Sequence, residues 1–284
     1  CNVTQPTLSS MIQKLEDELG VKIFDRSKQP IKPTTEGMLI IERAWSILVR
    51  AKQLKEVVEE ERHSLSGTFH IAVLPTIAPY LIPRFLPQFM NEYPALDIRI
   101  TEMKTEDIHR ALKHGDIDAG IVAQVEGQED FDSQQLYFEK FFVYVSKGDA
   151  LFNNKAIRTS DLTGEYLWLL DEGHCFRDQL TKFCHLKYDP RQQLNYSRGS
   201  LETFMHFVEQ GQGVTFIPEL AVEQLDAARR ELVRSFALPR PTRGVTLVTH
   251  REFVRHRLVS AIEGIITRSV PQAMLRLRSG QDLV

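Results

Sequence analysis

The spacing of hydrophobic residues changes along the chain, and each change predicts a different kind of element. From 5 to 19 apolar residues recur three and four positions apart, which predicts an amphipathic helix with Thr4 as N-cap that ends at Gly20. The same spacing runs from 34 to about 63 without a proline, which predicts one long helix. Beyond a linker at 64–67, short apolar runs alternate with helical segments, which predicts a parallel α/β sheet.

The first helix combines an apolar face with a polar face that could read DNA. The apolar face consists of Leu8, Met11, Ile12, Leu15 and Leu19. The first turns of the other face carry short hydroxyls and amides, namely Gln5, Thr7, Ser9 and Ser10. Such side chains at a helix N-terminus can reach base edges and phosphates in the major groove, although an ordinary amphipathic helix shows the same pattern. A basic turn with Lys28 and Lys32 follows and suits a wing over the phosphates.

The long helix has an apolar stripe that needs a covering surface. Its members are Ile40, Ala44, Ile47, Leu48, Ala51, Leu54 and Val58. A single helix cannot bury such a stripe alone, so the stripe packs either on a second copy of the chain or on another part of the same chain.

The α/β pattern predicts two lobes, and the chain is expected to cross from one lobe to the other twice. The first lobe is expected to contain strands at 68–74, 96–102 and 119–123 with helices at 78–93 and 106–114. The second is expected to contain strands at 135–146, 166–170, 193–197 and 214–217 with a helix at 200–210, before a strand at 245–249 and a helix at 254–266 return to the first. Ligands in such sheets bind beyond the carboxyl ends of strands. Thr76 and Thr105 follow two such ends, although a lone loop threonine is more often a turn or cap former.

Two of the three cysteines lie in one segment, 174–185, which has helical composition and no glycine or proline. In a helix, the nine steps from Cys175 to Cys184 put the thiols on opposite faces and roughly 13 Å apart along the axis. A disulfide needs Cα atoms within about 7 Å, so oxidation of this pair would require the helix to open. His174, Arg177 and the helix N-terminus favour a reactive thiolate at Cys175.

Two other interpretations of this segment stay open. The cysteines could be half-buried structural residues with no chemistry. Alternatively, two adjacent pairs could supply four zinc ligands, namely His174, Cys175, Cys184 and His185, although zinc sites usually use tight pairs such as C-x2-C. We expect neither a metal nor another cofactor, and we assign no role to Cys1.

Composition narrows the class of protein. The 284 residues are 42% hydrophobic and 26% charged, which is ordinary for a globular chain with a sizeable core. The net charge of −3 gives no global sign of nucleic-acid binding, so that function would rest on a local element. No apolar run approaches membrane-spanning length, and the chain does not open like a signal peptide. Because three cysteines are few and odd in number, we expect a reducing compartment and a cytoplasmic protein.

Four motifs within the first 37 residues carry a resemblance to a known family. They are Gln5-Pro-Thr-Leu-Ser9, Leu15-Glu-Asp-Glu-Leu-Gly20, Phe24-Asp-Arg26 and Pro33-Thr-Thr-Glu-Gly37. Together they resemble the winged helix-turn-helix of LysR-type transcriptional regulators. The resemblance implies a partial winged helix-turn-helix at 1–36, a linker and dimerisation helix with a hinge at 37–66, and a regulatory domain at 67–284 of the periplasmic-binding-protein type. Lobe I is expected at about 67–133 and 241–284 and lobe II at about 134–240. Since that family begins with a further helix, we expect this chain to start inside the DNA-binding domain.

Within that family, the segment from Gly173 to Gln179 with Phe183-Cys184 is similar to peroxide-sensing members. The similarity implies that Cys175 attacks hydrogen peroxide and that Cys184 then closes a reversible disulfide. It also implies that Thr76, Thr105 and His174 orient the peroxide. Arg177 and Arg243 are expected to favour anionic sulfur or an adjacent network.

The resemblance also implies partners. DNA would be bound by Gln5, Thr7, Ser9, Ser10 and Arg26, by a dimer or a dimer of dimers, with RNA polymerase as a further contact. Two other classes stay open: a LysR-type regulator that binds a small organic effector between its lobes, and a thiol peroxidase. The absence of a C-x-x-C motif argues against the peroxidase, and we do not expect an enzyme.

Overall fold

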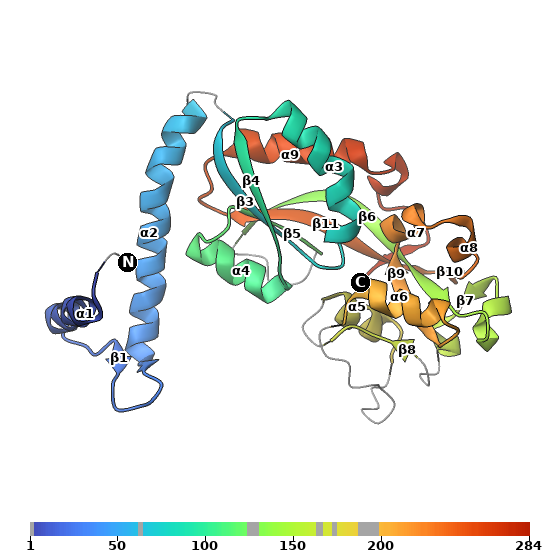
Figure 1. Ribbon diagram of the computed structural model, residues 1–284, viewed down its shortest axis with the longest axis horizontal. Helices are drawn as coiled ribbons and strands as arrows, with labels where there is room; N and C mark the ends of the chain where they lie inside the picture. The colour runs from blue at the N-terminus through green and yellow to red at the C-terminus, as the bar shows by residue number, and fades with distance from the viewer. Residues whose placement is uncertain (1–2, 62–64, 124–130, 163–166, 172–174, 187–198) are drawn as a thin grey trace.

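Two lobes of mixed β-sheet make up most of the chain, and a long helix stands beside them (Figure 1). The computed structural model describes residues 3–61, 65–123, 131–162, 167–171, 175–186 and 199–284. The helices are α1 (Gln5–Leu19), α2 (Thr35–Glu61), α3 (Ala78–Glu92), α4 (Thr105–His114), α5 (Cys175–Phe183), α6 (Leu201–Glu209), α7 (Glu219–Gln224), α8 (Ala227–Arg230) and α9 (His256–Ser269). The strands are β1 (Phe24–Asp25), β2 (Lys32–Pro33), β3 (Gly67–Val73), β4 (Leu96–Glu102), β5 (Ala119–Ala123), β6 (Phe131–Val145), β7 (Ala156–Ile157), β8 (Leu167–Trp168), β9 (Val214–Pro218), β10 (Val233–Phe236), β11 (Arg240–His250) and β12 (Gln281–Leu283).

The N-terminal unit, which consists of α1, β1 and β2, is held together by a buried carboxylate. Glu16, on the inner side of α1, accepts hydrogen bonds from the backbone N–H groups of Ile23 (2.8 Å) and Phe24 (3.1 Å). The Phe24 N–H is the largest of the influences that hold the pKa of Glu16 below its ordinary value. Strands β1 and β2 then pair as the expected antiparallel wing. Glu16 therefore fixes how the chain passes from α1 into the wing.

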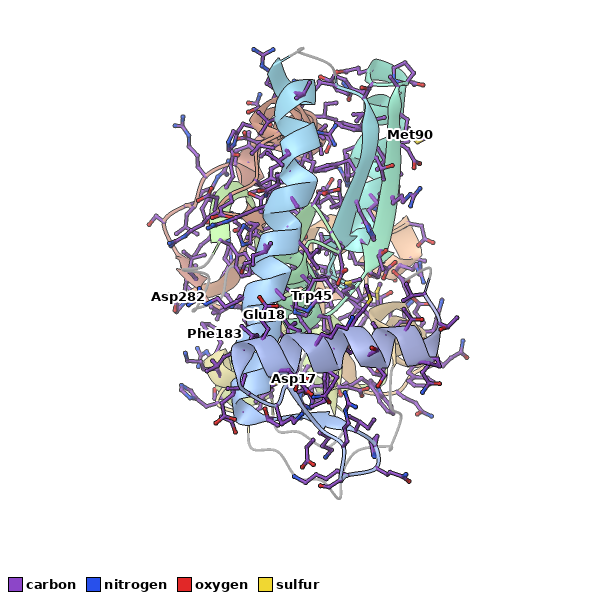
Figure 2. All side chains as sticks on the ribbon, turned by 90° about the vertical axis from the view of Figure 1, so that its left-hand side faces the viewer. Asp17, Glu18, Trp45, Met90, Phe183 and Asp282 are labelled. Atoms are coloured by element: carbon purple, nitrogen blue, oxygen red, sulfur yellow. The ribbon has the colours of Figure 1, made fainter. Side chains whose placement is uncertain are left out.

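The predicted apolar face of α1 is largely exposed. Leu8, Met11, Leu15 and Leu19 keep between 41% and 58% of their surface, and only Ile12 on that face is half-buried. Thr4 is the N-cap, as expected, but its hydroxyl bonds to the Thr7 hydroxyl at 2.9 Å instead of to a backbone N–H. The helix contacts its unit through the Glu16 side and lies across the lower part of α2 (Figure 2). Most of the apolar face of α1 is therefore open to solvent in the described structure.

Helix α2 packs on its own regulatory lobe, but not through its expected stripe. Trp45 stacks on His114 of α4 with ring centroids 4.6 Å apart, and Val49 is buried beside Gly115. Arg50 forms an ion pair with Glu252. Several stripe residues on other sides of α2 stay exposed, namely Ile47, Leu48, Leu54 and Val58. One side of α2 thus meets lobe I, while the stripe keeps an apolar surface open to a further partner.

The regulatory sheet is mixed, so the expectation of an all-parallel sheet is wrong. Strands β4, β3 and β5 are neighbours and run parallel, as the alternation of strands and helices predicts. However, β11 runs antiparallel to β5 and to β6. The reason is that β6 carries the chain out of lobe I and β11 carries it back, so the two strands run in opposite directions.

Strand β6 belongs to both lobes. It pairs with β11 as far as Lys140 and with β9 from Phe141 onward. Lobe I is covered by α3 and α9 on one face and α4 on the other (Figure 1). In lobe II, α6 begins at the expected N-cap, where the Ser200 hydroxyl accepts from the Thr203 N–H at 3.2 Å. The predicted strand at 193–197 lies outside the described residues.

Among the described residues, no helix is long and apolar enough to cross a membrane.

Gly37 provides a test of the N-terminal packing. A Cβ atom on Gly37 would lie 2.0 Å from the Ile23 carbonyl oxygen, so Gly37→Ala must push the start of α2 away from the wing. We expect a loss of about 1–3 kcal/mol in this unit, seen as faster proteolysis within 21–36. Gly20→Asn is the matched control because Gly20 has open space around it and asparagine tolerates its left-handed φ of 70°. Equal proteolysis of the two variants would contradict the packing described here.

Candidate functional site

A completely buried arginine lies where the two lobes meet. Arg243, in β11, has no exposed surface. Its Nε and Nη2 donate to one carboxylate oxygen of Glu139, in β6, at 2.9 and 2.8 Å. On its other edge, Nη1 donates to the Thr76 hydroxyl at 2.9 Å and Nη2 to the Thr76 carbonyl at 3.0 Å. The guanidinium therefore ties the loop after β3 to both crossing strands.

Further contacts fix the plane of this guanidinium. The second carboxylate oxygen of Glu139 accepts the Leu220 N–H at 3.1 Å, which anchors the acid to the start of α7. The rings of Phe141 and Phe176 lie 5.6 and 5.4 Å from the guanidinium carbon, at cation–π distances. Burial raises the pKa of Glu139, and the charge and hydrogen bonds of Arg243 oppose that rise. Glu139 thus both neutralises Arg243 and orients it.

Cys175 is the first residue of α5 and lies next to this cluster through its neighbour Phe176. Burial raises the pKa of the Cys175 thiol, since only 9% of the residue is exposed. The charge of Arg243, the Thr105 hydroxyl and the Phe176 N–H lower that pKa, but burial outweighs them. The Phe176 N–H at the start of α5 therefore favours the thiolate, as expected of a helix N-terminus, but burial keeps the pKa of the thiol above its ordinary value.

The two threonines lie at the same rim of the sheet but do different work. Thr76 uses its hydroxyl on Arg243, as described above. Thr105 begins α4, and its buried hydroxyl approaches the Cys175 sulfur closely enough to lower the thiol pKa. Within the described part of the chain that hydroxyl has no hydrogen-bond partner of ordinary geometry.

Two further residues of the predicted site are His174 and Arg177. His174 lies outside the described residues. Arg177 is half-buried in the first turn of α5, yet the cation with the largest lowering effect on the pKa of Cys175 is Arg243, from a distant strand. Among the described residues, no three His, Cys, Asp or Glu side chains gather as metal ligands.

Cys184 lies at the far end of the same helix. It is 5% exposed, its N–H still donates to the Leu180 carbonyl at 2.9 Å, and burial raises its pKa to about 12. Both cysteines are free thiols. Because α5 is intact between them, the axial separation is roughly 13 Å, well beyond the reach of a disulfide at about 7 Å. The structure is that of the reduced state.

The C-terminal end of α5 is closed by an unusual residue. His185 adopts a left-handed φ of 50°, and Leu186 donates back to the Thr181 carbonyl at 3.1 Å, which is the Schellman pattern. Glycine normally occupies that position, and another residue there costs about 1–2 kcal/mol. The end that must open for Cys184 to move is therefore the strained end.

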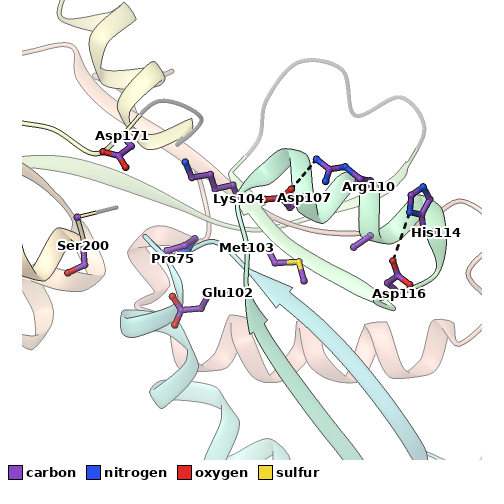
Figure 3. A pocket seen from close by; sticks show the side chains of 12 residues that line it. Pro75, Glu102, Met103, Lys104, Asp107, Arg110, His114, Asp116, Asp171 and Ser200 are labelled. Atoms are coloured by element: carbon purple, nitrogen blue, oxygen red, sulfur yellow. Dashed lines mark ion pairs between the residues drawn. The ribbon is translucent and has the colours of Figure 1, made fainter. Parts of the chain in front are cut away.

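A cavity and a groove flank the site between the lobes. A cavity of about 100 Å³ is lined in part by Thr76, Tyr80 and Leu170, and the Tyr80 hydroxyl donates to Glu202 at 2.8 Å across it. This volume is below the roughly 300 Å³ at which pockets for drug-sized ligands begin. A groove of about 670 Å³ continues along α4, with Asp171 and Ser200 of lobe II facing Lys104 of lobe I (Figure 3).

The predicted DNA-contacting side chains remain on the surface. Gln5, Thr7, Ser9 and Ser10 are all exposed in the first turns of α1. Arg26, with a side chain 44% exposed, follows β1 and lies 3.9 Å from Glu16.

Sequence reasoning missed Glu139, Phe141 and Phe176. A signal for Glu139 existed, because a glutamate interrupts the apolar run from 136 to 145. A charge within a buried strand needs a buried partner, and Arg243 is the partner that the fold supplies. No local pattern marked the two rings.

Fold and site together define a class of protein. A model of the LysR substrate binding domain matches residues 62–270, and a model of bacterial regulatory helix-turn-helix proteins of the lysR family matches residues 1–38. The chain therefore belongs to the LysR family of transcription regulators.

Within that family its relatives include proteins named for peroxide. It is similar to the hydrogen peroxide-inducible genes activator of Dickeya chrysanthemi, with 35% identity over 87% of this chain and 81% of the relative. It is also similar to the crystal structure of OxyR from Porphyromonas gingivalis, with a TM-score of 0.72 and 46% identity over 77% of this chain and 99% of that one. A mutant of OxyR from Corynebacterium glutamicum with H2O2 bound gives a TM-score of 0.67 at 26% identity, over 98% and 90% of the two chains.

The ion pair can be tested by mutation. Glu139→Ala leaves Arg243 buried without a counter-charge, so we expect it to lower the free energy of unfolding by about 3–5 kcal/mol, measured by urea denaturation. Glu139→Leu combined with Arg243→Met removes both charges and should restore most of the stability. A double variant no more stable than Glu139→Ala would show that the lost stability does not come from the unpaired charge.

Proposed function

We propose that this protein is a peroxide-responsive transcription regulator switched by a reversible disulfide between Cys175 and Cys184. The observation that carries the proposal is the position of two free, buried thiols at opposite ends of α5, one of them beside Thr105 and Arg243. Relatives named as peroxide-inducible activators support it, as does a related OxyR structure with H2O2 bound.

The chemistry starts at Cys175. Its thiolate attacks one oxygen of hydrogen peroxide, the O–O bond breaks, and the thiol proton leaves with the other oxygen as water, which gives a sulfenic acid. Thr105 donates to the bound peroxide, and Arg243 stabilises the negative sulfur while Glu139 and Thr76 hold its guanidinium. Thr76 also remains a group that orients the peroxide, because its hydroxyl accepts from Arg243 and keeps its own O–H as a donor. His174 is retained as a third group that orients the peroxide, and Arg177 as support from the same helix turn.

The second step converts chemistry into a change of shape. Cys184 attacks the sulfenic sulfur, which releases a second water and leaves the disulfide. Since the intact helix keeps the thiols too far apart, the disulfide can close only after α5 opens. Phe176 then leaves the face of Arg243, and the contacts between the lobes rearrange.

The output is a change in DNA binding. We infer that Gln5, Thr7, Ser9, Ser10 and Arg26 contact operator DNA, and that the open apolar stripe of α2 pairs with a second copy to form a dimer or a dimer of dimers. RNA polymerase is the further partner. A small organic effector is the second candidate signal, and the groove along α4 favours it. Reversal of the DNA footprint by a metabolite, with reductant having no effect, would identify that alternative.

The order of the two cysteines can be separated by substitution. Cys175→Ser should abolish peroxide oxidation, whereas Cys184→Ser should stop at a sulfenic acid that mass spectrometry and a dimedone adduct detect. Neither variant should show the reversible change in DNA binding. A full peroxide-dependent switch in Cys184→Ser would rule out the disulfide model.

The raised pKa of Cys175 sets a pH dependence. Below that pKa, the thiolate fraction grows by about tenfold per pH unit. We therefore expect the rate of sulfenic acid formation in Cys184→Ser to climb steadily between pH 6 and pH 8 (stopped-flow with peroxide in excess). A plateau within this window would mean that the reacting thiol is already ionised there, contrary to the effect of burial.

A further inference from the structure

Helix α4 connects the redox pocket, by which we mean Cys175 and the buried cluster around Arg243, to the linker helix α2. It runs as one unbroken element from Thr105 to His114. Its first residue faces the Cys175 sulfur, and its last residue stacks on Trp45 of α2. The helices that α4 contacts at its two ends belong to different parts of the molecule. Helix α5, which begins at Cys175, is in lobe II, whereas α2 carries the N-terminal unit (Figure 1).

The first end of α4 lies at the seam between the lobes. The Thr105 hydroxyl is buried and lies close enough to the Cys175 sulfur to lower the pKa of that thiol. Lys104 and Asp107 of the same turn line the groove whose opposite wall is Asp171 of lobe II (Figure 3). A movement of Cys175 away from Thr105 would therefore first change the contacts at the N-terminal end of α4.

The second end of α4 is the docking point of α2. The Trp45 and His114 rings are nearly parallel, with an interplanar angle of 12°. Directly after His114, Gly115 caps the helix with a left-handed φ of 69°, and a Cβ atom there would lie 2.9 Å from Val49. A close approach of this kind transmits small displacements because neither surface can yield without losing contact.

The middle of α4 is its point of closest support. Ile108 is fully buried and lies over Gly120 of β5, where a Cβ atom would come within 2.5 Å of its side chain. A helix of ten residues held tightly at its middle and contacted at both ends can tilt as a rigid body. Ile108 over Gly120 is the natural pivot.

We propose that α4 is a lever that carries the redox signal from Cys175 to Trp45 within one chain. The inference rests on the proposed disulfide switch. When α5 opens and Cys175 leaves Thr105, α4 tilts about Ile108, and its far end moves the Trp45 and Val49 contact. The linker helix and the N-terminal unit are then redirected without waiting for a change between subunits.

Trp45 itself is the probe, because the chain has two tryptophans. In the full chain with Trp168→Phe, the emission of Trp45 should shift after peroxide is added, with the time course of disulfide formation measured by mass spectrometry. Should Trp168→Phe fail to fold, subtracting the signal of Trp45→Phe from that of the unsubstituted chain gives the same quantity. The matched control is Trp168→Phe with Cys184→Ser, in which Cys175 is oxidised but no disulfide forms, and the emission should stay constant.

The outcomes separate the lever from the switch. If the disulfide forms while Trp45 emission stays constant, the lever is wrong and the disulfide switch stands. If Cys184→Ser shows the same shift, the signal comes from oxidation alone, and the lever is again overturned. If no disulfide forms, the proposed function fails and this inference fails with it.

Discussion

The buried guanidinium of Arg243 is the interaction on which the regulatory region depends. A fully buried cation is stable only when nearby groups accept its hydrogen bonds and neutralise its charge. Here Glu139 supplies the negative charge, and Glu139 and Thr76, from two different segments, accept the hydrogen bonds. The aromatic faces of Phe141 and Phe176 exclude water around it. Because β6, β11, the loop after β3 and the start of α5 must all be in place at once, the redox pocket exists only in the assembled two-lobed fold.

The same pocket explains how a stable resting state can coexist with a large rearrangement. Helix α5 is shorter than the roughly 12–15 residues at which isolated helices become stable, so it depends on packing of residues such as Cys175, Phe176 and Leu180. Oxidation at Cys175 acts on the first of these. The left-handed His185 at the other end weakens the helix where Cys184 has to leave. A short helix that depends on packing and has one strained end can be lost through a local event.

How far the sequence alone reaches differs between the parts of the molecule. Local patterns predicted α1, the length of α2, the strands of lobe I and the helix that contains Cys175, because hydrophobic spacing and glycine stops are local signals. They did not predict the direction of β6 and β11, which depends on the chain crossing twice between lobes. Local patterns also pointed to Arg177 as a charge beside the thiol. Arg243, 68 positions further along the chain than Cys175, was expected only from the family resemblance, and its hydrogen bonds to Glu139 and Thr76 became visible only in the tertiary structure.

Because both sulfurs are buried, oxidation of the thiols and reduction of the proposed disulfide would require different kinds of access. With Cys175 only 9% exposed, the proposed switch favours a compact uncharged oxidant over a bulky one such as glutathione disulfide. Once α5 has opened, the bond that must be reduced lies on an altered surface. Activation is thus filtered by molecular size and recovery by access for a macromolecular reductant, so the response can outlast the pulse of oxidant that started it.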